Sequence, residues 1–457
     1  MMDFRALYQR QADQYHAGTC DLGSWHRLRL ATVLDHVTRR SPFYRRHLAG
    51  IDLDTITPDD LTALPFTTKA DLRREMYDVL CGPPSDARIF YETTGTTGAS
   101  TPCPRGAKDI FSSNTSVERS WRHLFAKHFG DRMPVVGLMG PSELYAFGDV
   151  FTDVTERLGA CHVKIWPESP RVGFRKALRL IDELGVEVIV CAPALCLSLA
   201  KAALHHGYRL EDLNVSMFLV LGEICTPEFR ENVSAVWPKA TVYPTLYGSQ
   251  EALCIATGAT SGQLHLAELN YIAELVDPDT GRYLGRRGEG ELTLTMLIDG
   301  IKPLIRYRTA DLVRISDAEG TGVPGPRIEV IGRAADRIEL GSATLQPAEL
   351  ESLVLDGTRG CLGYQVVIDT DDSVTVRLDL LPEISGDPAE VHLRIAARLR
   401  ERTGVAARIS VESELDPVTN TGSFVSWKAA RILDHRREAD DAMRVARSVA
   451  HRYATTT

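Results

Sequence analysis

Between about residues 133 and 250, short apolar runs alternate with amphipathic stretches. The amphipathic stretches, such as 174–185 and 227–237, repeat their apolar positions at helical spacing. The apolar runs have the length of buried strands and lie at 135–140, 161–166, 186–191, 217–222 and 241–246. Strands that are apolar on both faces and alternate with helices are typical of a parallel sheet. We therefore predict a parallel sheet covered by helices in this part of the chain.

The pattern changes after about residue 270, where turns and strands replace the helices. The run 288–297 alternates Leu292, Leu294 and Met296 with polar residues. A period of two predicts a strand with one buried face. We expect a β subdomain at the end of the large α/β domain, which we place at residues 1–332.

A smaller unit follows at residues 336–457. The run 373–380 alternates strictly, residues 389–404 carry one apolar helical stripe that ends at a glycine, and 407–415 has the pattern of another strand. We predict a small, mobile α+β domain. The whole chain is therefore an α/β protein with a large amino-terminal domain of parallel-sheet layers plus a β subdomain.

Composition narrows the class of protein. The 457 residues contain 52 Lys and Arg and 61 Asp and Glu, a formal net charge of −9, which argues against nucleic acid or an anionic membrane as the main partner. The nine cysteines form no CxxC pair and are expected to be reduced. The polar first residues are unlike a secretory signal, and no apolar run has the length of a membrane span. We expect a cytoplasmic enzyme or binding protein.

Three glycines and five threonines crowd the stretch YETTGTTGASTPCPRG at 91–106. Backbone N–H groups in a glycine-rich turn can form a concave anion site, to which threonine hydroxyls add donors. The stretch is not a Walker loop, because the chain contains no Gly-Lys dipeptide. By itself this pattern allows two interpretations, a phosphate-binding loop or a polar surface turn.

Further motifs decide between them. They are SPFYRRHL (41–48), LPFTTKADLR (64–73), TTGTTG (93–98), GE (222–223), YGSQE (247–251), PLIRYRTAD (303–311), GRAADRIEL (332–340) and WKAARILDHR (427–436). In this order they resemble the motifs of the adenylate-forming superfamily, and most closely those of its phenylacetate-CoA ligase branch. The resemblance covers most of the chain and implies ATP-dependent adenylation of a carboxylic acid.

The resemblance also implies roles for individual residues. Thr94, Glu251 and Lys428 would be catalytic, with Glu251 also binding Mg²⁺. The acid pocket would include Tyr145, Phe147 and Gly148. ATP or AMP would be bound by Thr93, Thr94, Gly95, Thr96, Thr97, Gly98, Gly222, Glu223, Tyr247, Gly248, Ser249, Asp311 and Arg333. Among these, Tyr247 would stack on adenine and Asp311 would accept the ribose hydroxyls.

The sequence departs from the family pattern at several positions. The hinge residue, usually charged, is Ala335, and Ser342 stands where a glycine normally borders the pantetheine tunnel. The lysine that usually follows the phosphate loop is absent, which leaves Arg105 as the nearest cation, and RTGD has become RTAD. These changes lie mainly at positions that serve the family's second half-reaction, in which the acyl group passes from the adenylate to its acceptor.

We expect a small aromatic carboxylic acid as substrate and coenzyme A as acceptor. The alternative keeps the adenylation but uses a carrier protein, an amine, or nitrite activated for attack by an arylamine. A nucleotide-binding sensor is a third interpretation, which the retention of Lys428, Glu251 and Asp311 disfavours. The sequence leaves the oligomeric state open, a homodimer included.

Overall fold

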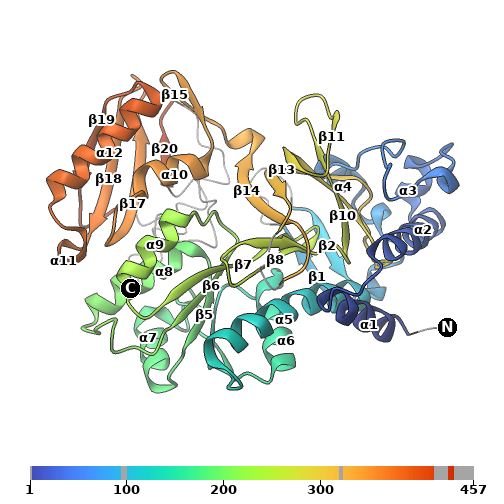
Figure 1. Ribbon diagram of the computed structural model, residues 1–457, viewed down its shortest axis with the longest axis horizontal. Helices are drawn as coiled ribbons and strands as arrows, with labels where there is room; N and C mark the ends of the chain where they lie inside the picture. Colours follow the sequence, from blue (N-terminus) through green and yellow to red (C-terminus); the bar gives the residue numbers. More distant parts are fainter. Residues whose placement is uncertain (1–2, 94–99, 319–322, 416–430, 437–457) are drawn as a thin grey trace.

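The structure is a computed structural model that describes residues 3–93, 100–318, 323–415 and 431–436 (Figure 1). The helices are α1 (Phe4–His16), α2 (Leu22–Arg40), α3 (Pro42–His47), α4 (Lys69–Glu75), α5 (Ala107–Phe129), α6 (Ala146–Leu158), α7 (Gly173–Glu183), α8 (Pro193–His205), α9 (Pro227–Val236), α10 (Pro347–Leu355), α11 (Pro382–Ser385) and α12 (Pro388–Thr403). No helix in these ranges combines the length and the hydropathy that crossing a bilayer requires.

The strands form one large sheet, one smaller sheet and two hairpins. They are β1 (Ile89–Glu92), β2 (Pro102–Arg105), β3 (Val136–Met139), β4 (His162–Lys164), β5 (Val188–Cys191), β6 (Met217–Leu221), β7 (Thr241–Ser249), β8 (Leu253–Gly258), β9 (Leu264–Leu266), β10 (Tyr271–Val276), β11 (Tyr283–Gly285), β12 (Gly288–Met296), β13 (Tyr307–Ser316), β14 (Arg327–Arg333), β15 (Ile338–Leu340), β16 (Ala343–Leu345), β17 (Cys361–Ile368), β18 (Val374–Leu380), β19 (Ala407–Val411) and β20 (Ile432–Asp434).

The large sheet has the strand order β11-β10-β12-β13-β14-β9-β8-β7-β6-β5-β3-β4. Its β4-β3-β5-β6-β7 part is parallel, as the apolar runs predicted. The predicted β subdomain is present as the antiparallel remainder, but it continues the same sheet, because β8 pairs antiparallel with β7. The two parts of the large domain thus share one twelve-stranded sheet.

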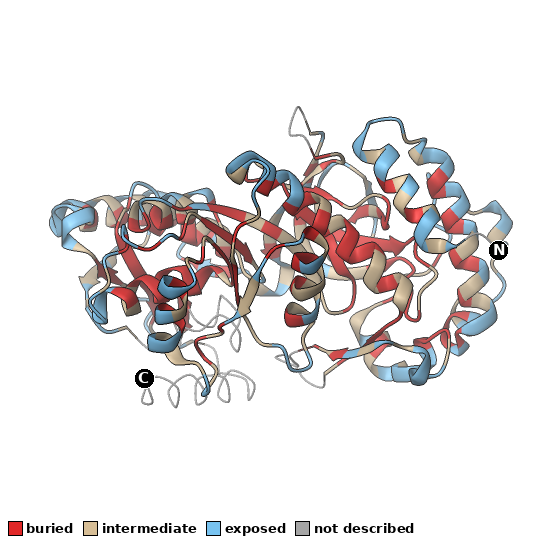
Figure 2. Cartoon of the chain, turned by 90° about the horizontal axis from the view of Figure 1, so that it is seen from below, coloured by how far each residue is buried: buried red, intermediate tan, exposed pale blue. Residues whose placement is uncertain are grey.

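Helices cover both faces of the parallel part. Trp121 of α5 stacks on Phe151 of α6 with their ring centroids 5.2 Å apart, and both belong to the cluster over Val136 and Val188. The other face carries α7, α8 and α9, whose buried residues include Leu199 and are packed with the opposite side of the strands. Figure 2 shows buried strands in the interior of the molecule and partly exposed helices around them.

The antiparallel part is covered by the amino-terminal helices. Leu30 and Val33 of α2 pack in one cluster with Leu292 and Leu294 of β12. The predicted alternation along β12 does not end in an exposed face, however, since Thr295 is also buried and accepts a hydrogen bond from the Arg306 backbone N–H at 3.1 Å. This strand is therefore buried on both sides.

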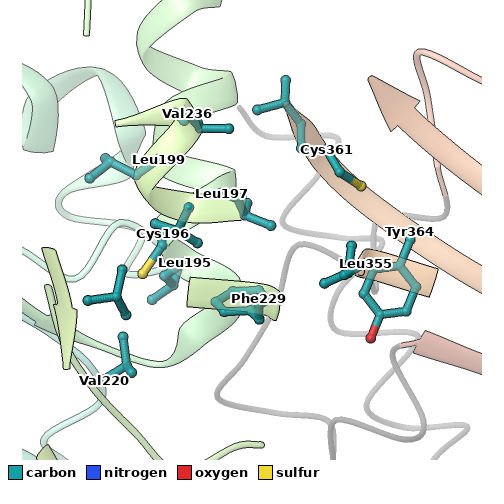
Figure 3. Packing of buried hydrophobic residues seen from close by; sticks show 14 of the residues in the cluster. Leu195, Cys196, Leu197, Leu199, Val220, Phe229, Val236, Leu355, Cys361 and Tyr364 are labelled. Atoms are coloured by element: carbon teal, nitrogen blue, oxygen red, sulfur yellow. The ribbon is translucent and has the colours of Figure 1, made fainter. Parts of the chain in front are cut away.

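The carboxyl-terminal unit contains the four-stranded sheet β19-β18-β17-β20 with α10 and α12. The predicted strand at 373–380 and helix at 389–404 correspond to β18 and α12. The unit packs on α8 and α9, so that Leu355 and Tyr364 belong to the same buried cluster as Leu195 and Phe229 (Figure 3). The short helix Ala334–Asp336 follows β14 and precedes this unit; the domain boundary itself stays a prediction.

Candidate functional site

The predicted nucleotide residues lie where the parallel strands end. Gly222 and Glu223 follow β6 directly, and Tyr247, Gly248 and Ser249 form the last residues of β7. Ligands of open α/β sheets bind at the carboxyl ends of the strands. At Gly248 a Cβ would lie 2.0 Å from the Leu253 carbonyl oxygen, so the β7–β8 hairpin requires glycine there.

Three of the predicted residues meet around one carboxylate. The Tyr247 hydroxyl donates to Asp311 Oδ2 at 2.7 Å, and Arg333 Nε lies 2.9 Å from Asp311 Oδ1. Asp311 and Arg333 face each other because β13 and β14 pair in that register. Burial and the neighbouring carboxylate raise the pKa of Tyr247, so its hydroxyl is a neutral donor. The aspartate thus has both oxygens engaged and a fixed orientation.

The backbone before Asp311 is in an unusual conformation. Ala310 has φ +63°, in the left-handed region that favours glycine over residues with a Cβ. Its N–H donates to Glu291 Oε1 at 3.1 Å, and the Asp311 N–H donates to Thr309 Oγ1 at 3.1 Å. Local hydrogen bonds therefore hold a conformation for which the RTGD glycine of the family pattern is better suited.

Glu251 is buried and forms an ion pair with Lys69, whose Nζ lies 3.0 Å from Glu251 Oε1. Burial alone would raise the pKa of Glu251, but Lys69, with smaller contributions from a backbone hydrogen bond and the charge of Lys302, outweighs it and holds the pKa below its usual range. Lys69 is the first residue of α4, which begins with a capping box between Thr68 and Asp71. A lysine of the LPFTTKADLR motif therefore contacts the predicted metal ligand.

The base of the predicted phosphate loop is a closed hairpin. The Thr101 N–H donates to Thr93 Oγ1 at 2.9 Å, and the Thr93 N–H donates to the Thr101 carbonyl at 3.2 Å. Strand β2 then runs from Pro102 to Arg105. Residues 94–98, predicted to hold the phosphates, and Lys428 lie outside the described residues.

Glu223 lies beside the first turn of α8, where the Ala194 N–H donates to its Oε2 at 3.3 Å. Burial raises its pKa to about 7, although the charge of Arg431 from the carboxyl-terminal unit acts in the opposite direction. One of the residues predicted to bind the nucleotide is therefore a carboxyl with a pKa near neutral pH.

The predicted acid pocket residues lie around the start of α6. A Cβ at Gly140 would come within 2.8 Å of the Phe147 ring, which therefore sits directly over the end of β3. Gly148 is required as well, because a Cβ there would lie 2.3 Å from Ser142 Oγ. Tyr145 precedes the helix and is half-buried. The three residues come together, but their role in binding an acid stays a prediction.

Sequence reasoning missed several charged residues of the site. Lys69 stands inside the LPFTTKADLR motif, to which no role for this side chain was assigned, and Lys302 directly precedes PLIRYRTAD. Arg306, within PLIRYRTAD, forms a buried ion pair with Glu274 at 3.1 Å and donates to the Leu64 carbonyl at 2.8 Å. It therefore joins the PLIRYRTAD and LPFTTKADLR motifs, a contact that no local pattern indicates.

Comparison with known proteins agrees with this arrangement. Residues 83–296 match the family model described as AMP-binding enzyme. The phenylacetate-coenzyme A ligase of Pseudomonas putida is 27% identical over 448 residues, covering 93% of this chain and 97% of that protein. That of Thermus thermophilus is 26% identical over 442 residues, covering 90% and 95%. The chain is therefore similar to AMP-binding enzymes over residues 83–296 and to phenylacetate-coenzyme A ligases over most of its length.

The solved structures of adenylate-forming enzymes support the fold. A 2-hydroxyisobutyryl-CoA ligase in its postadenylation state superposes with a TM-score of 0.74 at 19% identity, covering 93% of this chain and 91% of that one. The same ligase in its thioesterification state gives a TM-score of 0.61. At this level of identity the likeness establishes the shared fold alone.

Proposed function

We propose that this protein uses ATP to convert a small aromatic carboxylic acid into an acyl-adenylate and then transfers the acyl group to coenzyme A. The observation that carries the proposal is the junction of Tyr247, Asp311 and Arg333 at the carboxyl end of the parallel sheet. An ionised carboxylate has about four lone-pair sites, so Asp311 can accept ribose hydroxyls while Tyr247 and Arg333 keep it oriented. The full-length similarity to phenylacetate-coenzyme A ligases supports the second step.

In the first step the acid's carboxylate oxygen attacks the α-phosphorus, and the bond to the β-phosphate oxygen breaks to release pyrophosphate. The acid needs no general base, because a carboxylate is already ionised at neutral pH. The chain's contribution is therefore positioning and placement of positive charge. Lys428, which lies within the motif WKAARILDHR, is the proposed cation at the α-phosphate.

Glu251 fits a Mg²⁺ site. Its carboxylate is buried and held ionised, and Mg²⁺ is typically bound by one or two carboxylates together with phosphate oxygens. Bound metal would neutralise phosphate charge. In the structure Lys69 forms an ion pair with this carboxylate. Its side chain is 39% exposed, so it can move into solvent when a metal ion binds.

In the second step the thiol sulfur of coenzyme A attacks the acyl carbonyl, and AMP leaves. The alternative acceptors, a carrier protein, an amine or nitrite, depend on Ser342 obstructing thiol passage. The structure gives this serine a partner, since Ser342 Oγ donates to the Thr403 carbonyl at 3.2 Å within the carboxyl-terminal unit. Gly341 is needed in place, because its φ is +57° and a Cβ would lie 2.2 Å from the same carbonyl oxygen. A hydroxyl bound inside the unit favours coenzyme A.

The test measures pyrophosphate release across a panel of aryl acids, aminoaryl acids and nitrite, and then searches for the acyl-CoA by mass spectrometry. We expect both products with a good aryl acid. Pyrophosphate without acyl-CoA would establish another acceptor, and pyrophosphate from nitrite alone would establish the diazotising alternative. Absence of pyrophosphate with every acid would refute the proposed adenylation.

A further inference from the structure

Two fully buried cations lie under strand β2, directly beyond the predicted phosphate loop. Lys302 is 1% exposed, and its Nζ donates to the Pro102 carbonyl at 2.6 Å. Arg105, at the end of the same strand, is 0% exposed and donates from Nη2 to the Gln250 carbonyl. Lys302 comes from the segment between β12 and β13, some 200 positions along the chain, so the fold brings these charges together.

In the described part of the chain neither side chain forms an ion pair with a carboxylate, although the charge of Arg105 opposes the raising of the Asp109 pKa by burial, and the charge of Glu251 opposes the lowering of the Lys302 pKa by burial. Besides the carbonyl, Lys302 Nζ lies 3.6 Å from Cys103 Sγ, and burial raises the pKa of this thiol, which keeps it protonated. The Nε and Nη1 atoms of Arg105 are buried with no hydrogen-bond partner in the described part of the chain. A buried charge without compensation costs several kcal/mol, so such donors indicate an anion that binds there.

Two carboxylates nearby have other partners, although Asp109 Oδ1 is buried with no hydrogen-bond partner in the described part of the chain. Glu251 pairs with Lys69, and Asp109 Oδ2 accepts the backbone N–H groups of Gly106 at 2.7 Å and Ile301 at 3.1 Å. With Lys69 counted, three cations stand against these two carboxylates. The excess of positive charge lies between the metal ligand proposed above and the strand that leaves the phosphate loop.

We propose that Lys302 and Arg105 form a cationic floor beneath the β1–β2 hairpin that stabilises the polyphosphate of ATP and the departing pyrophosphate. The floor replaces the lysine that is absent after the loop in this sequence. Both are positioning residues: Lys302 acts through its hold on the Pro102 carbonyl and through its charge, and Arg105 through the Gln250 carbonyl next to Glu251. This inference rests on the proposed function, since it assigns the ligand as ATP.

The test measures the affinity of the full chain for ATP, pyrophosphate, AMP and inorganic phosphate by calorimetry. Lys302→Met keeps the length and removes the charge. We expect ATP and pyrophosphate to bind roughly tenfold more weakly, which is about 1.4 kcal/mol, while AMP binding changes less than about twofold. Lys164→Met, which removes an exposed lysine on the edge strand β4, is the matched control and should change none of the four affinities.

A second pair of variants distinguishes the loss of a charge from misfolding. Arg105→Met should lose pyrophosphate affinity as Lys302→Met does, whereas Arg105→Lys should retain most of it, with thermal unfolding recorded for each protein. Equal losses for ATP and AMP would show a merely structural role, and unchanged pyrophosphate affinity in both charge-removing variants would overturn the floor. If inorganic phosphate alone bound with the affinity of pyrophosphate, the site would be a general anion site and not a polyphosphate floor.

The outcome is separable from that of the proposed function. Wild-type protein that releases pyrophosphate with an aryl acid, but whose variants bind polyphosphate normally, would refute the floor alone. Wild-type protein that binds ATP with the expected variant profile, but activates no acid, would refute the proposed acid ligase alone.

Discussion

Asn232 offers the sharpest test of how the carboxyl-terminal unit is held. It lies on α9 and is fully buried, and its amide makes two hydrogen bonds to the backbone of Cys361, the first residue of β17. Nδ2 donates to the Cys361 carbonyl at 2.7 Å, and the Cys361 N–H donates to Oδ1 at 2.9 Å. The substitution Asn232→Ala removes both bonds at once.

The size of the effect follows from what is left behind. The Cys361 N–H and C=O would each remain buried without a partner, and an unsatisfied buried group costs about 1–3 kcal/mol. We take about 2–4 kcal/mol for the pair. If amides of β17 exchange when the unit separates from α9, their hydrogen exchange should accelerate roughly 30- to 1,000-fold, since each 1.4 kcal/mol is a factor of ten.

Hydrogen exchange followed by mass spectrometry on peptides of β17 and α9 measures this directly. The control is Glu231→Ala on the same helix, which removes an exposed ion pair with Arg359 across the same boundary and should cost less than about 1 kcal/mol. Exchange in Asn232→Ala that accelerates no more than in Glu231→Ala would refute the reasoning, because the two bonds would then not hold the unit in solution.

Three further predictions concern the site. Ala310→Gly should stabilise the protein by about 1 kcal/mol in thermal unfolding, since glycine adopts φ +63° without a Cβ clash; a destabilised variant would contradict the left-handed conformation. Lys69→Met should raise the pKa of Glu251, because the largest contribution that opposes burial is lost, so the acidic limb of the adenylation rate should move to higher pH; an unmoved limb would mean that another group controls it. Lys428→Ala should slow adenylation roughly 10²–10³-fold while sparing thioester formation from pre-made acyl-adenylate, and equal loss in both steps would contradict an adenylation-specific role.

The elements of the parallel sheet could be predicted because their residues carry the evidence locally. Strands buried on both faces, such as β5 and β6, are apolar throughout, and the helices α7 and α9 show an apolar stripe. The joining of both sheet parts could not be predicted in this way. It depends on the antiparallel pairing of β8 with β7, which is set by a hairpin that needs Gly248 and has no distinctive pattern.

The residues of the candidate site also divide into those that the sequence could predict and those that it could not. Tyr247, Asp311 and Arg333 stand in recognisable motifs, so their order along the chain sufficed to group them. Lys302 does not, because a lysine within an apolar stretch has no assignable partner until β2 is known to lie against it. The strain at Ala310 was visible only as a departure from a family pattern, and its meaning required the backbone angle.

The shared apolar cluster has a thermal consequence for any rearrangement of the carboxyl-terminal unit. Leu355, Cys361 and Tyr364 are buried together with residues of α8 and α9, so separation would hydrate apolar surface on both sides (Figure 3). Hydration of apolar surface raises the heat capacity. The equilibrium between packed and separated arrangements should therefore follow a curved van't Hoff plot, and cooling should weaken the apolar part of the packing. An enzyme built on such a contact would change the balance between its two half-reactions with temperature even where neither chemical step does.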